Sequence, residues 1–141
     1  MPYMKIRVHL IWATKNRDPL LSREIRPKLF NHIRENAHEK NIHIDFINGY
    51  TQHVHVLVSL RPDQSISKVV QSIKGESSFW MNKNRLIGVK FAWQEEYIAV
   101  SVSESMINKV REYIKNQEEH HRKKSFGEEY REFMKRYHFG G

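Results

Sequence analysis

The order in which strand-like and helix-like apolar patterns follow one another constrains the fold of this sequence most strongly. Residues 5–14 (KIRVHLIWAT) alternate with a period of two, which is typical of a β-strand. Residues 42–50 and 53–60 are two further β-branched segments, and the Asn48-Gly49 pair near the end of the first predicts a hairpin between them. A fourth strand region is expected within residues 91–102.

Helix-like segments separate or follow these strands. The segments 22–40, 65–82, 103–122 and 125–137 each begin with a serine, which is a favourable N-cap residue. The first three carry apolar residues at intervals of three or four, and the last is expected to be a short terminal helix. Within the fourth strand region, the polar Gln94-Glu95-Glu96 run indicates a turn or irregularity.

The predicted order is therefore β-α-β-β-α-β followed by helices. It is typical of the α+β class, in the ferredoxin-like or RRM-like split βαβ arrangement. We expect an antiparallel four-stranded sheet with helices on one face and extra C-terminal helices, formed by residues 1–141 as a single domain. This scaffold carries many functions, so the function must be argued from particular residues.

Composition narrows the class of partner. The formal net charge of +8, from 24 basic and 16 acidic residues, favours a polyanionic partner, above all nucleic acid. The absence of cysteine excludes a disulfide framework and a thiolate metal site. The segment MPYMKIRVHLIW lacks the pattern of a signal peptide, and no apolar run reaches the roughly 20 residues that span a bilayer. We therefore expect a cytoplasmic protein without a membrane segment.

The third predicted strand carries two histidines with metal-ligand spacing. His53 and His55 project from one face of the strand, while Val54 and Val56 point to the other. Their Cα atoms are then roughly 6.5–7 Å apart, so the two imidazoles can bind one metal ion. The same spacing also fits two surface histidines.

The third predicted helix carries a tyrosine and an amide one turn apart. Tyr113 and Gln117 share a helical face at the edge of an apolar stripe, where a side chain can emerge beside the sheet. A boundary tyrosine that packs its ring and exposes its hydroxyl explains this position equally well.

Together, the strand HxH and the helix YxxxQ resemble the site of the HUH nucleases. More closely, the sequence resembles the small insertion-sequence transposases with one catalytic tyrosine, commonly called TnpA, which include the REP-associated tyrosine transposases. The similarity runs through nearly the whole chain, in the segments HLIWATKNRDPLL, HVHVLV, SISKVVQSIKGESS, WQEEYIAVSVS, YIKNQEEHH and FGEEYREF. It implies a nucleoid-associated DNA transposase of a bacterium or archaeon, which cleaves and rejoins single-stranded DNA at hairpin-containing ends.

The resemblance also implies a role for each site residue. His53, His55 and Gln117 are then the metal ligands, and Tyr113 is the nucleophile that forms a 5′-phosphotyrosine intermediate. Mg²⁺ is the expected divalent metal, and nitrogen ligands also accept Mn²⁺. Strand exchange needs two nucleophiles and each chain offers one, so a homodimer is implied, with Tyr113 acting in cis or in trans.

Residues that contact DNA are indicated less specifically. Lys74 could meet a phosphate, and Gly75 could permit a close backbone approach. Lys15, Arg17 and Arg85 are candidates for a groove that follows the DNA backbone, although ordinary surface charge explains each of these positions as well.

Three alternatives remain open from the sequence. The chain could be a non-catalytic RRM-like protein that binds single-stranded nucleic acid, or a metal-dependent phosphodiesterase that uses water. It could also be a domesticated relative that processes genomic repeats instead of moving its own element. Loss of Tyr113 would abolish cleavage by a transposase, whereas binding by an RRM-like protein and hydrolysis by water would persist.

Overall fold

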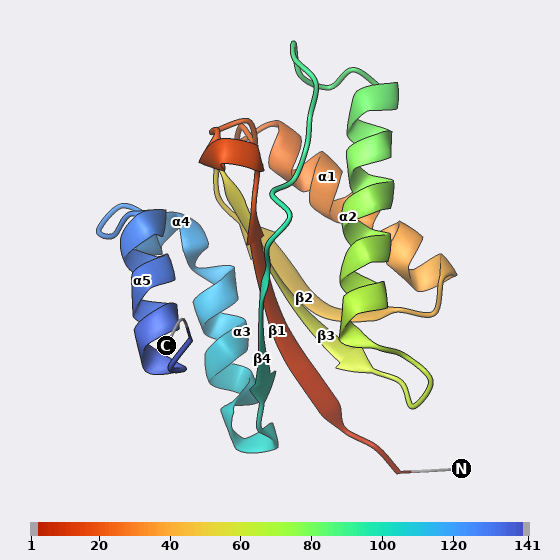
Figure 1. Cartoon of the computed structure of the whole chain (residues 1–141), viewed down its shortest axis with the longest axis vertical. Helices are drawn as coiled ribbons and strands as arrows, with labels where there is room; N and C mark the ends of the chain where they lie inside the picture. The colour runs from red at the N-terminus through yellow and green to blue at the C-terminus, as the bar shows by residue number, and fades with distance from the viewer. Residues whose placement is uncertain (1–2, 140–141) are drawn as a thin grey trace.

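The protein is described by a computed structural model covering residues 3–139, in which a four-stranded sheet carries helices on both faces (Figure 1). The strands are β1 (Ile6–Ala13), β2 (His43–Gly49), β3 (His53–Leu60) and β4 (Ile98–Val102). They lie in the order β2-β3-β1-β4, and every neighbouring pair is antiparallel. This is the α+β split βαβ arrangement that the sequence predicts.

One face of the sheet packs against α1 (Ile25–Glu39) and α2 (Ile66–Lys83) (Figure 1). The valines of β3 that alternate with the histidines point into this layer and are fully or almost fully buried. The serine cap of α2 is confirmed, because the Ser65 hydroxyl accepts a hydrogen bond from the Lys68 N–H. The N-cap residue of α1 is Glu24 instead of Ser22, although the Ser22 hydroxyl accepts a hydrogen bond from the Ile25 N–H in the turn before the helix. This layer is the main hydrophobic core.

The C-terminal helices α3 (Ile107–Lys115), α4 (Gln117–His120) and α5 (Phe126–Arg136) lie against the opposite face. Leu57 of β3 packs with α3, and Ile11 of β1 packs with Phe126 of α5. The second face, which carries the two histidines of β3, is therefore also covered by helices. Among the described residues, no helix combines the length and apolar character that crossing a membrane would require.

The prediction of one continuous helix over residues 103–122 is wrong at its start and in its interior. A short 3₁₀ helix, η2 (Glu104–Met106), separates Ser103 from α3, and the Ser103 side chain forms no capping hydrogen bond. The helix then breaks at Asn116, with φ −95° and ψ 28°. Near this break, the Asn48 side-chain amide donates hydrogen bonds to the carbonyls of Ile114 and Lys115, both at 3.0 Å. In a continuing helix these carbonyls would accept hydrogen bonds from backbone N–H groups one turn later. The hydrogen bonds from Asn48 therefore compete with continuation of the helix.

The predicted fourth strand region is confirmed only over its second half, where β4 forms. Before it, Trp93 makes a single bridge with Thr14, and the Gln94 N–H donates to the Ala13 carbonyl at 2.9 Å. The irregularity therefore lies between Trp93 and Ile98, as the polar run predicts.

Candidate functional site

His53 and His55 are fully buried under the C-terminal helices, and each has one ring nitrogen engaged by a neighbouring side chain. The His55 Nδ1 lies 2.8 Å from the Nε2 of His9, and the His53 Nδ1 lies 3.1 Å from the Oε1 of Gln52. These contacts leave both Nε2 atoms facing the space between β3 and α5. Such an orienting partner on the second nitrogen is typical of histidines that bind metal.

Gln117 lies in the same buried space. Its Oε1 is 3.0 Å from the His53 Nε2, and its Nε2 donates to the Tyr113 carbonyl at 3.2 Å. The break before α4 turns the Gln117 side chain back over α3, so its amide oxygen faces the histidines. The two histidines and the amide therefore come together within one chain.

Tyr113 approaches from α3 with its ring edge-on to His55, at 5.5 Å between ring centroids. Its hydroxyl donates a hydrogen bond to the Oε2 of Glu129. Burial first, and then the negative charge and the hydrogen bond of Glu129, raise the pKa of Tyr113 above its ordinary value. The phenol is therefore held in its protonated form beside the histidine pair.

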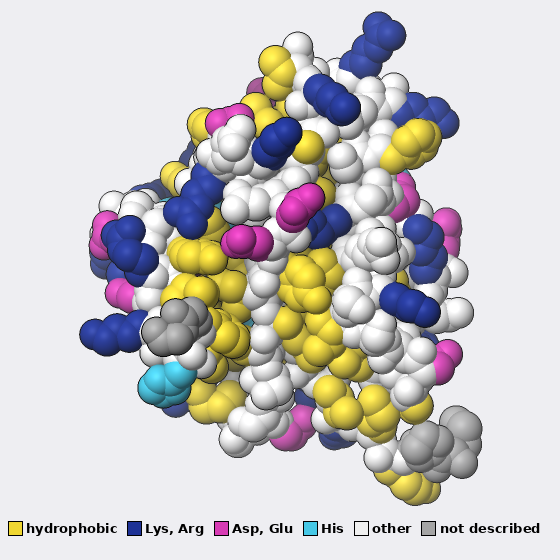
Figure 2. Space-filling model, in the orientation of Figure 1, with side chains coloured by type: hydrophobic (Ala, Val, Ile, Leu, Met, Phe, Trp, Pro, Cys, Tyr) yellow, Lys and Arg dark blue, Asp and Glu magenta, His cyan; other side chains and the backbone are white. Residues whose placement is uncertain are grey.

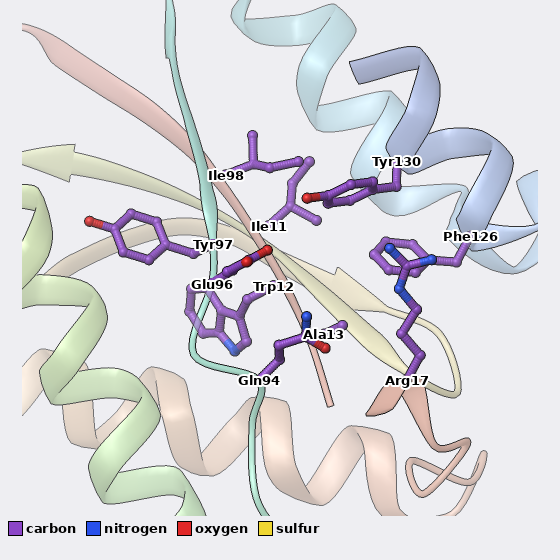
Figure 3. Close-up of a pocket in the computed structure, with 10 residues that line it drawn as sticks. All are labelled: Ile11, Trp12, Ala13, Arg17, Gln94, Glu96, Tyr97, Ile98, Phe126 and Tyr130. Atoms are coloured by element: carbon purple, nitrogen blue, oxygen red, sulfur yellow. The ribbon is translucent and has the colours of Figure 1, made fainter. Parts of the chain in front are cut away.

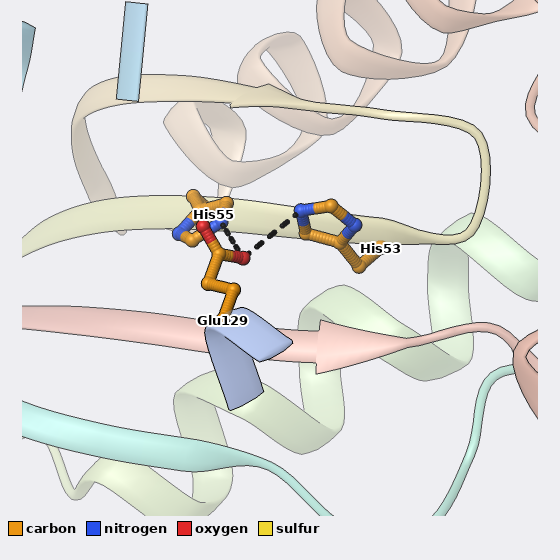
Figure 4. A group of neighbouring side chains, drawn as sticks. All are labelled: His53, His55 and Glu129. Atoms are coloured by element: carbon orange, nitrogen blue, oxygen red, sulfur yellow. Dashed lines mark hydrogen bonds and ion pairs between the residues drawn. The ribbon is translucent and has the colours of Figure 1, made fainter. Parts of the chain in front are cut away.

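Glu129 is the residue that sequence reasoning missed. It lies on α5 with 2% of its surface exposed, and its Oε1 is 3.4 Å from the His53 Nε2 and 3.3 Å from the His55 Nε2 (Figure 4). A signal existed, since Glu129 falls within the apolar stripe between Phe126 and Phe133, where an acidic residue is out of place unless it has buried partners.

His120 and His121 complete the surroundings of this carboxylate. The charged residues on both sides of this pair indicate a solvent-facing position, but only 23% and 2% of the two side chains are exposed. The His120 Nε2 lies 3.0 Å from the Glu129 Oε2, and the His121 Nε2 lies 3.1 Å from the Gln117 Oε1. Five histidines, counting His9, therefore surround one glutamate and one glutamine.

Electrostatics favour neutral imidazoles at His9 and His53 and an ionised carboxylate at Glu129. Burial first, and then the field of His55, lower the pKa of both His9 and His53. Burial acts to raise the pKa of Glu129, but hydrogen bonds with His121 and His55 and the fields of the nearby histidines outweigh it, so the pKa lies below its ordinary value. Neutral imidazole and ionised carboxylate are the forms that bind metal.

The donor set fits a divalent metal ion. The ligand atoms of His53, His55 and Glu129 all lie within 4.8 Å of one another. Neighbouring donors about 2.1 Å from an octahedral ion are about 3 Å apart. The separations of 3.0 Å between His53 and Gln117 and 3.3–3.4 Å from Glu129 to the two histidines are close to this value. A buried His/His/Glu group that could bind a divalent metal is therefore present.

The residues expected to contact DNA lie outside this centre. Lys15 and Arg17 form the exposed 3₁₀ helix η1 (Lys15–Arg17), and Arg85 is exposed in the loop after α2. In Figure 2, Lys and Arg side chains surround the upper part of the molecule, where Figure 1 places η1 and this loop.

Lys74 and Gly75 lie on α2 and differ in surroundings. The Lys74 ammonium donates to the carbonyls of Gln94, Glu95 and Glu96, the last two at 3.0 and 3.4 Å, so its own chain already engages it. Gly75 is exposed, and a Cβ built on it would meet nothing within 4 Å. Its surface is therefore open to a close approach from outside.

A narrow pocket opens beside the centre, between the start of β4 and α5 (Figure 3). Its volume of about 30 Å³ is space for one water molecule. Phe126 and Arg17 line it, and the Arg17 guanidinium lies 5.2 Å from the centre of the Phe126 ring. Phe126 in turn stacks on His53, with 4.1 Å between ring centroids. The first turn of α5 therefore covers the histidine pair.

Comparisons with known proteins agree on the family. The family model described as "Transposase IS200 like" matches residues 2–117. The ISDra2 transposase TnpA of Deinococcus radiodurans is 29% identical over 119 residues, which cover 80% of this chain and 84% of that protein.

Solved structures share the fold. The crystal structure of a transposase candidate from Deinococcus radiodurans R1 superposes with a TM-score of 0.65 at 28% identity, covering 82% of this chain and 93% of that one. A REP-associated tyrosine transposase bound to a REP hairpin has a TM-score of 0.64, covering 86% of this chain and 72% of that one, and at 18% identity it shows the fold alone. Because the family model spans most of the chain, including both histidines and Tyr113, this protein belongs to the family of IS200-like transposases.

Proposed function

We propose that this transposase cleaves and rejoins single-stranded DNA at hairpin-containing ends through a covalent bond to Tyr113. The observation that carries the proposal is the placement of the Tyr113 hydroxyl, His53, His55 and Gln117 around one buried point of a single chain. A phenol beside a metal-binding group suits metal-assisted phosphoryl transfer to tyrosine.

In the proposed step, the Tyr113 oxygen attacks the phosphorus of the scissile phosphodiester, and the bond from phosphorus to the 3′ oxygen breaks. The products are a 5′-phosphotyrosine and a DNA strand whose 3′ oxygen takes up a proton. The phenol loses its proton as the new bond forms, and the Glu129 carboxylate already accepts the hydrogen bond from that hydroxyl. Attack by another 3′-hydroxyl reverses the step and joins new ends without a separate energy source.

His53, His55 and Gln117 would hold the metal ion, with Mg²⁺ proposed in the cell and Mn²⁺ as a substitute. When bound, a divalent ion would polarise the phosphate and neutralise the charge that develops on its oxygens. The histidines contribute neutral nitrogen donors whose second nitrogens are already engaged by His9 and Gln52. They are therefore preorganised for this role.

The RRM-like alternative is disfavoured by the position of the C-terminal helices. An RRM-like binder stacks bases on an open sheet face. Here the face that carries His53 and His55 is covered by α3 and α5, and both histidines are fully buried. Whether the protein moves its own element or processes genomic repeats depends on which DNA it cuts. The experiment below therefore uses hairpins from the flanking genome.

The proposal extends to the DNA path and to the assembly. The exposed Lys15, Arg17 and Arg85 would meet the phosphate backbone, and the exposed Gly75 would allow close approach along α2. The placement of Tyr113 beside its own chain's histidines supports attack in cis. Strand exchange then requires two such centres, so we propose that two copies act together as a homodimer.

The test is incubation of the protein with labelled single-stranded DNA carrying hairpins from the flanking genome, with Mg²⁺ or Mn²⁺. Denaturing electrophoresis would compare the wild type with Tyr113→Phe and His53→Ala, and with Tyr137→Phe as a control at an exposed tyrosine. We expect a metal-dependent protein–DNA adduct in the wild type and the control that is absent from the other two variants. Cleavage that persists in Tyr113→Phe would point to hydrolysis by water. Binding without cleavage or adduct would favour the RRM-like alternative.

A further inference from the structure

Glu129 makes contacts that the proposed mechanism leaves partly unexplained. Its carboxylate is buried at 2% exposure on α5, and the match of the family model ends at residue 117, before this helix. A carboxylate in such a place is costly unless charges or hydrogen bonds compensate it. Its two oxygens face different partners, and this division suggests a specific role.

The Oε1 atom faces the ligand atoms. It lies 3.4 Å from the His53 Nε2 and 3.3 Å from the His55 Nε2 (Figure 4), while His53 is 3.0 Å from the Gln117 Oε1. Donors bound in neighbouring positions around one octahedral ion are about 3 Å apart, so this oxygen stands where a fourth ligand would be. The other three donors are neutral, and a carboxylate would supply the hard anionic oxygen that Mg²⁺ and Mn²⁺ prefer.

The Oε2 atom faces the nucleophile. It accepts the hydrogen bond of the Tyr113 hydroxyl, and the His120 Nε2 lies 3.0 Å away. The Tyr113 ring itself packs against the rings of His55, His120 and Phe133. The rings fix the plane of the phenol, and Glu129 fixes where its oxygen points.

The helix that carries Glu129 is anchored on both sides of the carboxylate. Ser125 caps its first turn by accepting from the Glu128 N–H, and Phe126 stacks on His53. The Arg17 guanidinium lies 4.8 Å from the centre of the Tyr130 ring on the next turn. These contacts hold the Glu129 side chain in place without any partner outside the chain.

We propose that Glu129 binds the same metal ion as His53, His55 and Gln117 through Oε1 while Oε2 positions the Tyr113 hydroxyl. One carboxylate would then set both the affinity for the ion and the place of the nucleophile. The inference rests on the proposed function, since it assumes the metal centre and the role of Tyr113. It adds an anionic ligand from a helix that lies beyond the matched family region.

The proposed role of Glu129 as a metal ligand is tested without DNA. Mn²⁺ is titrated into chelator-treated protein, and binding is measured by calorimetry and by the electron paramagnetic resonance of free Mn²⁺. The proteins are the wild type, Glu129→Gln, Glu129→Asp, His53→Ala and the control Glu132→Gln, an exposed glutamate on the same helix that pairs with Lys124. We expect the dissociation constant to rise at least about tenfold in Glu129→Gln, the loss that follows removal of a group supporting a metal site. Glu129→Asp should fall between Glu129→Gln and the wild type, and Glu132→Gln should match the wild type.

The outcomes separate the two proposals. If Glu129→Gln binds Mn²⁺ like the wild type while His53→Ala does not, Glu129 is not a ligand and the proposed metal centre stands. If the wild type itself binds no Mn²⁺, the metal centre of the proposed function is wrong. Circular dichroism and thermal unfolding of Glu129→Gln verify that the variant is folded, and Glu129→Asp provides a second variant if it is not.

The proposed role of Glu129 in positioning the Tyr113 hydroxyl is tested at Mn²⁺ concentrations that saturate each variant. Single-turnover formation of the protein–DNA adduct is measured against the concentration of a hairpin-containing single strand. We expect Glu129→Gln to lower the maximal rate at least about tenfold, with the half-saturating DNA concentration unchanged, because a misplaced nucleophile affects the reacting state and not DNA binding. A maximal rate equal to that of the wild type would overturn the positioning role.

Discussion

Asn48 of β2 caps the carboxyl end of the helix that carries Tyr113 by donating to the Ile114 carbonyl at 3.0 Å. The same amide group donates to the Lys115 carbonyl at 3.0 Å. This contact from β2 therefore supports the end of α3, which lies between Tyr113 and Gln117.

Replacing Asn48 should destabilise this helix end. Asn48→Ala leaves the two carbonyls without this donor, at a cost of about 1–3 kcal/mol. Asn48→Asp keeps the shape but places a negative charge against a helix carboxyl end, so we expect a larger loss. Urea unfolding measures the stability, and adduct formation should fall in both variants. An aspartate variant as stable as the wild type would contradict the capping role.

The pair between Asp45 and Arg111 predicts a dependence of stability on pH. Arg111 donates from Nε and Nη2 to Asp45, at 2.8 and 3.0 Å, and these hydrogen bonds lower the pKa of the Asp45 carboxyl from 3.8. A lowered folded-state pKa means that the stabilisation is present above the unfolded pKa and is lost as the pH falls through the folded one. The unfolding free energies of the wild type and Asp45→Asn should therefore differ by a constant amount above about pH 5 and converge below about pH 4.

The control for this prediction is Asp63→Asn, at an exposed loop position before α2. Its difference from the wild type should vary less with pH than that of Asp45→Asn. If the Asp45→Asn difference stays constant down to pH 3, the pair does not stabilise the folded state in its ionised form.

Lys74 and Arg85 should respond differently to substitution, although both are candidates for DNA contact. The Lys74 ammonium is hydrogen-bonded to carbonyls of the segment before β4, so Lys74→Met should cost about 1–3 kcal/mol of stability. Arg85 is exposed, so Arg85→Ala should leave stability unchanged and weaken binding to single-stranded DNA. Each lost phosphate contact lowers the slope of log affinity against log salt by about 0.7.

The measurement is DNA binding at several salt concentrations beside urea unfolding of the same variants. An unchanged salt slope in Arg85→Ala would remove Arg85 from the DNA interface. A reduced slope together with unchanged stability in Lys74→Met would assign Lys74 to DNA and not to the fold.

Phe126 holds α5 over the histidine pair, so its truncation should loosen the site. Its ring is 4% exposed and stacks on His53. Removing a buried phenylalanine side chain costs about 3–5 kcal/mol, and Phe126→Leu should cost less because most of the volume remains. We expect Phe126→Ala to weaken Mn²⁺ binding through displacement of Glu129. Retention of full metal affinity in Phe126→Ala would show that α5 is not required for the centre.

The sequence predicted the elements whose patterns are local. The alternation of β3 places its valines in the core and both histidines on the opposite face, as the structure confirms. The serine caps at positions 65 and 125 were also predicted correctly, since a cap needs only the adjacent turn.

Features that depend on distant partners were not predictable in this way. The helix break at Asn116 coincides with the cap from Asn48, which lies 66 residues before Ile114, and the contact of His55 with Glu129 joins residues 74 positions apart. His120 and His121 follow two glutamates and precede three basic residues, which is typical of a solvent-exposed segment. The two histidines nevertheless face a buried carboxylate. The folding of the C-terminal helices over the second face decided each of these positions.

The two faces of the sheet differ in how much apolar surface secures them. The layer under α1 and α2 contains most of the buried apolar residues, whereas α5 is attached through a small cluster around Phe126. Segments with few buried contacts open locally without global unfolding, so the amides of residues 126–136 should exchange with solvent faster than those of β1 and β3. An opening of α5 would carry Glu129 away from the histidines. The centre would then lose its anionic donor in each such opening, so the rate of Mn²⁺ release would follow the rate at which α5 opens.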